Sequence, residues 1–202
     1  MNMKLKCKEH HKSKIHMNHR GSKGPSSFGM HDSVFAFEKL DLKPGNTFLD
    51  LGCGAGDYSL YAAKLVGELG NVYALDMWND IVEGVARQAE EAGLLNVHAK
   101  VSDIYEPLEM EDQSIDVCML ATVLHSKNVI EKSTGLFQEI KRVLKSEGRL
   151  VIIECKKEES SFGPLLEFRL APEELEEALG KLGFEKISYT DLGYNYMLVF
   201  DF

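Results

Sequence analysis

The stretch TFLDLGCGAGD, residues 47–57, decides the fold of this chain. It opens with residues that favour a β-strand, breaks at three alternating glycines and continues into a helix-compatible run, 58–69. A strand that turns through glycines into a helix brings bare backbone N–H groups and a helix N-terminus up to a ligand. A second predicted strand, 71–75, ends in Asp76, a carboxylate well placed to accept hydrogen bonds from a ribose diol.

The spacing of the glycines discriminates between cofactors. Dinucleotide-binding loops read G-x-G-x-x-G, whereas Gly52, Gly54 and Gly56 read G-x-G-x-G, with Asp50 two residues ahead. This pattern resembles motif I of the class I S-adenosylmethionine-dependent methyltransferases, (Asp/Glu)-x-Gly-x-Gly-x-Gly. The resemblance implies S-adenosyl-L-methionine as the cofactor and S-adenosyl-L-homocysteine as its product. A glycine-rich turn in another kind of α/β protein is the alternative.

Length and composition favour a single-domain cytoplasmic protein. The 202 residues suit one domain with a full core and a tail or small lid. No apolar run reaches the roughly 20 residues that span a bilayer, and the N-terminus lacks the apolar segment of a secretory signal. The scattered cysteines form no C-x-x-C pair, which fits a reducing compartment; they are Cys7, Cys53, Cys118 and Cys155.

The net charge of −9 is unevenly distributed. Residues 1–24 carry seven Lys or Arg and one acid, whereas residues 25–202 carry 16 basic and 31 acidic residues. Such an acidic body is a poor electrostatic match for a phosphate backbone. A nucleic acid is therefore not expected as the substrate, although the basic N-terminal segment could still contact an anionic partner.

Residues 1–29 are predicted to form a polar, basic, His-rich tail or lid, and residues 30–202 the methyltransferase domain. Cysteine and histidine are the usual zinc ligands. Several of them lie near the start of the chain, namely Cys7, His10, His11, His16 and His19. Their spacings match neither a zinc finger nor a zinc ribbon, so no metal site is predicted. Three alternatives remain for this segment, in order of preference: a mobile solvated tail, a lid over the site, and a metal site.

Strand and helix patterns alternate along the rest of the chain. Further strands are predicted at 97–101, 115–124, 150–154, 185–190 and 194–200, and helices at about 30–40, 79–92, 129–145 and 171–182. Asp32 or Ser33 is the expected N-cap of the first of these helices. The alternation predicts a Rossmann-like open sheet of seven strands, mostly parallel with an antiparallel C-terminal strand and with helices on both faces.

Two further stretches carry the resemblance. Residues 116–125 resemble motif IV of the small-molecule methyltransferases related to quinone-biosynthesis enzymes, in which a central strand ends near the transferred methyl group. Residues 142–150 resemble the Arg-Val-Leu-Lys-Pro-Gly-Gly turn of the same family, with Ser146 and Glu147 replacing its proline and first glycine.

In an open parallel sheet, ligands bind at the carboxyl ends of the strands. By resemblance, the cofactor there would contact Asp50, Gly52, Cys53, Gly54, Gly56, Asp76, Met77, Ser102, Asp103, Ile104 and Ala121. Asp50 would orient its ammonium, Asp76 would bind its ribose hydroxyls and Asp103 would contact its adenine amine. Met77 and Ile104 would line the adenine. Asp103 as a simple turn cap is the alternative.

The resemblance implies methyl transfer to a small molecule by in-line displacement, which mainly requires alignment and exclusion of water. His125 is the candidate general base, needed where the attacking atom carries a proton; a wall residue is its alternative role. Tyr58 is a weaker candidate of the same kind. By resemblance, the lid residues are Phe28, Met30 and His31, or these simply pack the first helix on the sheet.

Three other functions stay open at this point. The chain could be a non-catalytic adenosylmethionine-binding module or partner subunit, or a protein or RNA methyltransferase, although no recognition module is visible. An NAD-dependent oxidoreductase is disfavoured by the glycine spacing. The identity of the acceptor and the oligomeric state are not encoded in any pattern that we can interpret.

Overall fold

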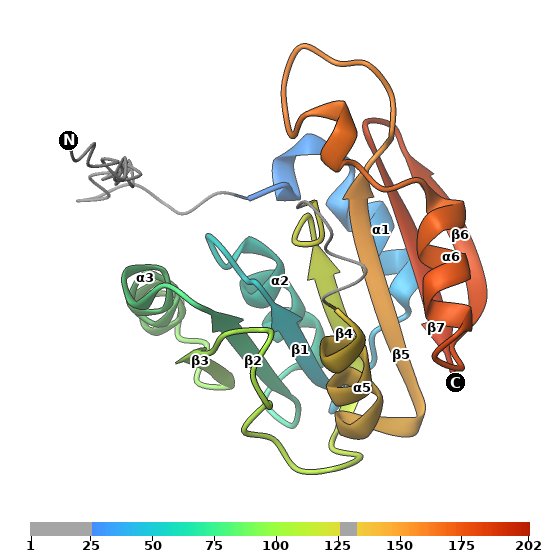
Figure 1. Ribbon diagram of the computed structural model, residues 1–202. Helices are drawn as coiled ribbons and strands as arrows, with labels where there is room; N and C mark the ends of the chain where they lie inside the picture. Colours follow the sequence, from blue (N-terminus) through green and yellow to red (C-terminus); the bar gives the residue numbers. More distant parts are fainter. Residues whose placement is uncertain (1–25, 126–132) are drawn as a thin grey trace, which may run out of the picture.

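The computed structural model of the chain describes residues 26–125 and 133–202 (Figure 1). The alternatives for residues 1–24, including the metal reading of Cys7 and the histidines, lie outside the described residues. So does the part of the predicted helix 129–145 that precedes Ser133.

A seven-stranded sheet in the order β3-β2-β1-β4-β5-β7-β6 forms the centre of the molecule. Strands β1 to β5 pair in parallel, and β7 runs antiparallel to both β5 and β6. The predicted fold class is therefore confirmed. The strands are β1 (Thr47–Leu51), β2 (Asn71–Asp76), β3 (Val97–Val101), β4 (Ile115–Ala121), β5 (Leu144–Cys155), β6 (Glu185–Leu192) and β7 (Asn195–Asp201).

Helices cover both faces of the sheet. Successive side chains of a strand point to opposite faces, so a strand that is buried throughout needs cover on each face. In β1, Phe48 packs toward the face covered by α1 (Ser33–Leu40) and α2 (Asp57–Val66), whereas Leu49 and Leu51 pack toward the opposite face. That opposite face carries α5 (Thr134–Val143) and α6 (Pro172–Gly180), and α3 (Asn79–Glu91) lies beside β2 and β3 (Figure 1). Strand order reverses between β1 and β4, so the switch point lies beside the glycine loop.

Several predicted boundaries were wrong, each for a local reason. The first helix begins at Ser33, later than the predicted start near Met30, but its N-cap is Asp32, one of the two that were expected. The Asp32 carboxylate accepts a hydrogen bond from the Phe35 N–H at 3.0 Å. A separate 3₁₀ turn, η1 (Phe28–Met30), precedes the helix. Helix α2 ends at Val66 and not at Leu69, because Gly67 adopts a positive φ of 66°.

Two strand boundaries also differ from the prediction. Strand β4 stops at Ala121 and not at Leu124, because Thr122 adopts a φ of 55°, outside the β region. Strand β5 begins at Leu144 and not at Leu150, because Leu144 pairs with Ile115 across a register shift. The pattern of apolar residues cannot reveal such an irregularity.

The glycine loop is packed tightly enough to generate a stability prediction. A Cβ atom added to Gly56 would lie 2.7 Å from Val85 Cγ2, and Gly56 also has a φ of 80°. We expect Gly56→Ala to lower the free energy of unfolding by roughly 2–4 kcal/mol, through the strain of left-handed backbone plus overpacking. Chemical denaturation measures this directly.

Gly45→Ala is the matched control, since Gly45 has a φ of 84° and nothing within 4 Å of the added Cβ. It should cost only the backbone strain, about 1–2 kcal/mol. Equal losses in the two variants would show that contact between the loop and α3 does not constrain Gly56.

Candidate functional site

The end of β2 holds the glycine loop in place. The Leu75 carbonyl accepts hydrogen bonds from the Gly52 and Cys53 N–H groups at 2.8 and 2.9 Å. The Asp76 carboxylate accepts one from the Gly54 N–H through Oδ2 and one from the Trp78 N–H through Oδ1, both at 3.1 Å. Each carboxylate oxygen has a second lone pair, so Asp76 keeps acceptor capacity for a ligand.

Asp50 lies beneath this loop, with its side chain almost wholly buried (1% exposed). The Ser59 hydroxyl donates to its Oδ2 at 2.5 Å, and no Lys or Arg of the described residues pairs with it. Burial raises the pKa of the Asp50 carboxyl to about 7; the Ser59 hydrogen bond opposes this, and the negative charge of Asp76 adds to it. The Asp50 carboxyl therefore has little surface available for direct contact with a ligand.

Cys53 contributes backbone and not sulfur to this loop. Its side chain is buried against Ala74 and Val85, on the side of α3. Burial raises the pKa of the Cys53 thiol, with the charges of Asp50 and Asp76 acting in the same direction. Such a thiol is unreactive.

Apolar and polar residues line the ends of β2 and β3. Met77 and Trp78 are 53% and 63% exposed, although both are large and apolar. The Ser102 N–H donates to the Asp76 carbonyl at 2.9 Å, which joins the two strand ends. Asp103 is exposed and accepts a hydrogen bond from the Tyr105 N–H at 3.0 Å, so it does cap a turn. Ile104 is partly buried against the core.

The chain turns sharply at the end of β4. Thr122 donates its N–H to the Ile153 carbonyl and its hydroxyl to the Ala121 carbonyl, both at 2.7 Å. Val123 then packs over Gly52, where an added Cβ would lie 2.7 Å from Val123 Cγ2. The end of β4 and the glycine loop are therefore in direct contact, as a common site requires.

His125 follows this turn and faces a buried carboxylate. Glu154, near the end of β5, is 1% exposed and accepts a hydrogen bond from the Leu124 N–H at 2.6 Å through Oε1. Its Oε2 atom lies 3.6 Å from His125 Nδ1. The His125 side chain is 34% exposed, yet its Nδ1 atom is buried and has no hydrogen-bond partner among residues 26–125 and 133–202.

The segment before α1 joins the site through Tyr58. The Tyr58 hydroxyl lies 3.1 Å from Ser27 Oγ and 3.2 Å from His31 Nε2. The Phe28 ring packs edge-on against the Tyr58 ring, with 5.0 Å between the ring centroids. His31 Nδ1 lies 3.3 Å from the Asn195 side-chain oxygen at the start of β7. Phe28, His31 and Tyr58 therefore come together.

Met30 does not join this cluster but lies exposed on η1. Burial lowers the pKa of His31, against the effect of its Asn195 hydrogen bond, and burial raises the pKa of Tyr58. A neutral Tyr58 hydroxyl is a hydrogen-bond donor and a poor base.

The polar loop between β5 and α6 stands at the same end of the sheet (Figure 1). The buried Arg169 guanidinium fixes it by donating to backbone carbonyls, at 2.8 Å to Glu158, 2.9 Å to Pro164, 2.9 Å to Phe162 and 3.2 Å to Lys156. Because all these acceptors are backbone atoms, the arginine ties the loop to itself.

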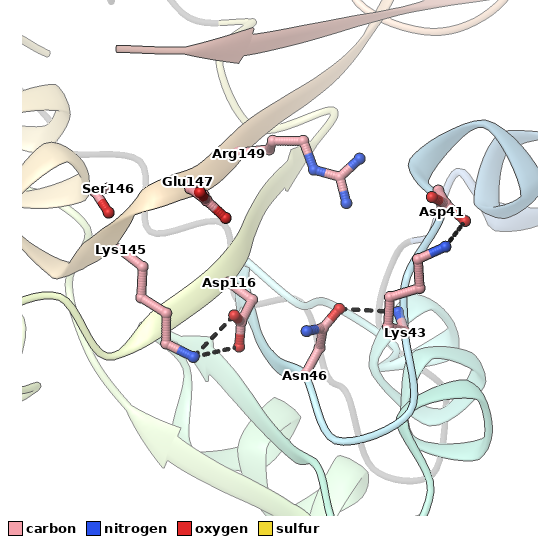
Figure 2. A pocket seen from close by; sticks show the side chains of 8 residues that line it. All are labelled: Asp41, Lys43, Asn46, Asp116, Lys145, Ser146, Glu147 and Arg149. Carbon is pink, nitrogen blue, oxygen red and sulfur yellow. Dashed lines mark hydrogen bonds and ion pairs between the residues drawn. The ribbon is translucent and has the colours of Figure 1, made fainter.

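A hollow of about 310 Å³ lies at the opposite, amino end of β1 and β4 (Figure 2). Its charges are largely paired: Lys145 bridges both oxygens of Asp116 at 2.8 Å, and Lys43 pairs with Asp41. The Arg149 guanidinium extends into it (Figure 2). None of the predicted cofactor residues lines this hollow, so we locate the functional site at the carboxyl ends.

Comparison with known proteins identifies the family of this chain. The sequence model of one protein family, described as a methyltransferase domain, matches residues 42–182. The chain belongs to this methyltransferase family. A crystal structure of a SAM-dependent methyltransferase from Aquifex aeolicus shares 31% identity and a TM-score of 0.78, over 88% of this chain and 93% of that one. S-adenosylmethionine is thus the cofactor of the family.

Curated relatives of this methyltransferase include enzymes named for quinones. A 2-phytyl-1,4-naphtoquinone methyltransferase from Trichormus variabilis is 34% identical over 134 residues, which cover 63% of this chain and 56% of that protein. A ubiquinone/menaquinone biosynthesis C-methyltransferase from Hydrogenovibrio crunogenus is 35% identical over 134 residues, 65% of this chain and 51% of that protein. The chain spans about half the length of these relatives.

Some residues of the site were not predicted from the sequence. Ser27 and Asn195 lie in no predicted motif, and only the folded chain brings them to Tyr58 and His31. Glu154 did carry a signal, because an acid at the end of an apolar strand is unusual.

The pKa of Asp50 predicts a pH dependence of stability. In the folded chain this carboxyl titrates near pH 7, compared with an ordinary value of 3.8. Between these values the folded state binds more protons than the unfolded state, so the Asp50 contribution to stability falls as pH rises. Relative to Asp50→Asn, the wild type should lose roughly 2–3 kcal/mol between pH 5 and pH 8 in urea unfolding.

The quantity to compare is the change of the unfolding free energy with pH in the wild type and in Asp50→Asn, because the two proteins share all their other carboxyl groups. Asp103→Asn, which changes an exposed acid of the same site, should leave the wild-type slope unchanged. Parallel curves for the wild type and Asp50→Asn would mean that Asp50 stays ionised in the fold.

Proposed function

We propose that this chain transfers a methyl group from S-adenosyl-L-methionine to a small-molecule acceptor by in-line displacement. The observation that carries the proposal is the convergence of the glycine loop, Asp76 and His125 at neighbouring strand ends of one sheet edge. Membership of the methyltransferase family supports it.

The residues present fit such a cofactor. At Gly52 and Gly56 a Cβ would clash with Val123 and Val85, so only glycine fits where the loop packs against these side chains. The carboxyl of Asp50 has no cationic partner among the described residues, and a nearby ammonium would lower its pKa again. We assign Asp76 to the ribose, and the exposed Met77 to the adenine, with Ser102, Asp103 and Ile104 beside it.

The acceptor is proposed to be small and apolar in part. Curated relatives are named for naphthoquinone and ubiquinone or menaquinone substrates. Near the mouth of the site, Phe162 and Leu165 are exposed on the loop held by Arg169, where they would contact such a ring. We expect cytoplasmic action; the described cysteines are free and buried, and no described helix is long and apolar enough to cross a membrane.

The chemistry requires little covalent participation by the protein. The cofactor supplies a methyl group on a good sulfonium leaving group. The site contributes alignment and exclusion of water, for which Phe28, His31 and Tyr58 form a cover at the end of β1. His125 would accept the proton when the attacking atom of the acceptor carries one.

Titration calorimetry with the full chain tests the cofactor assignment. We expect micromolar binding of S-adenosylmethionine and S-adenosylhomocysteine and none of NAD. Asp76→Ala should remove most of this affinity, because it deletes the proposed ribose acceptor and also releases the Gly54 and Trp78 N–H groups.

Asp103→Ala is the comparison variant, since it removes an exposed acid that holds its own turn and is proposed to lie beside the adenine. It should weaken binding less than Asp76→Ala. Unchanged affinity in Asp76→Ala would contradict the ribose assignment, and binding of NAD alone would overturn the proposed function. Cofactor binding with no turnover on any acceptor would indicate a binding module.

His125→Ala should lower kcat by roughly 10²-fold while the affinity for S-adenosylmethionine changes little, because a general base acts only on the chemical step. Steady-state kinetics and calorimetry on the same preparation separate the two quantities. His98→Ala is the matched control: His98 is also half-buried, but it bonds to Asn71 on the surface of β2 and β3. Wild-type turnover in His125→Ala would make His125 a wall residue.

A further inference from the structure

We propose that Glu154 is a positioning residue that selects the tautomer of His125, holding the proton on Nδ1 and leaving Nε2 free to accept one. The inference rests on the proposed function, in which His125 takes the proton of the acceptor. It assigns a role to a carboxylate that neither cofactor binding nor the core requires.

The burial of Glu154 is the first observation. Its side chain is 1% exposed, and no Lys or Arg among the described residues forms an ion pair with it. Burying a carboxylate without a cation costs several kcal/mol. The Leu124 N–H satisfies only Oε1. The Oε2 atom remains directed toward the imidazole of His125, 3.6 Å away.

The unpartnered Nδ1 atom is the second observation. Nδ1 of His125 is buried and lacks a hydrogen bond within the described part of the chain, a state that is costly for a polar atom. A shift of less than about 1 Å would bring it into hydrogen-bonding range of Glu154 Oε2. Since Nδ1 is buried while a third of the side chain is exposed, the accessible part of the ring lies away from Glu154.

These two groups are chemically complementary. A neutral imidazole has one nitrogen that donates and one that accepts, and an ionised carboxylate only accepts. Glu154 therefore favours the tautomer protonated at Nδ1. When the acceptor atom bonds to the methyl carbon, the carbon–sulfur bond breaks with its electron pair remaining on sulfur. The acceptor proton then moves to Nε2, and Glu154 stabilises the resulting imidazolium.

A purely structural role, in which Glu154 only caps the Leu124 N–H, predicts a different response to Glu154→Gln. The amide oxygen of glutamine can keep the bond to Leu124. Its NH₂ group then faces Nδ1 and donates to it, which favours the tautomer protonated at Nε2. The amide cannot flip without directing NH₂ at the Leu124 N–H.

The test is nitrogen NMR of the full chain labelled with ¹⁵N-histidine, at a pH where His125 is neutral, with its signals assigned by their loss in His125→Ala. We expect Nδ1 to carry the proton in the wild type and Nε2 to carry it in Glu154→Gln. This readout needs no acceptor. Asp116→Asn is the matched control, because Asp116 also accepts from a backbone N–H, that of Thr47 at 2.7 Å, at the other end of the sheet.

Kinetics give the second readout. Glu154→Gln should lower kcat by roughly 10²-fold, leave cofactor affinity within about twofold and add no further loss to His125→Ala. Asp116→Asn should keep wild-type kcat. An Nε2-protonated His125 in the wild type, an unchanged tautomer in Glu154→Gln, or losses that multiply in the double variant would each overturn the positioning role. Failure of the wild type to bind cofactor or to turn over would instead refute the proposed function, whatever the tautomer.

Discussion

The hydrogen bonds that the end of β2 makes to the glycine loop are the constraint on which the site depends. Through one carbonyl and one carboxylate, Leu75 and Asp76 accept the N–H groups of three consecutive loop residues and of Trp78. The loop can lie this close only because its glycines reach left-handed backbone angles and leave space for Val123 and Val85. The positions of α2, the β4 turn and the proposed ribose contact all follow from this attachment.

Buried carboxyl groups are the second feature of this site. Asp50 and Glu154 stand near the ends of β1 and β5, each 1% exposed and each without a Lys or Arg partner in the described chain. Desolvation makes such carboxyls costly in isolation. Under the proposed function, the ammonium of the methyl donor would offset this cost at Asp50, whereas Glu154 faces His125.

The fold and the backbone part of the site were predictable from the sequence because they rest on short-range patterns. Apolar runs mark strands, alternating glycines mark the loop, and parallel strands bring Asp50, Asp76 and His125 to one edge. The side-chain contacts were not predictable in the same way. The bonds of Tyr58 to Ser27 and His31 depend on how the segment before α1 returns over β1, and the left-handed Thr122 breaks a strand pattern without any glycine.

The loop that Arg169 organises has a consequence for how this scaffold can diversify. The guanidinium donates to main-chain carbonyls, so these hydrogen bonds do not depend on the side chains at the four acceptor positions. The Phe162 ring also stacks on Tyr194, whereas Leu165 and Leu166 are exposed and can be exchanged without breaking these hydrogen bonds. One buried arginine thus fixes the main chain of the loop while its exposed side chains can vary. Under the proposed function, such exchanges would change which acceptors the site takes.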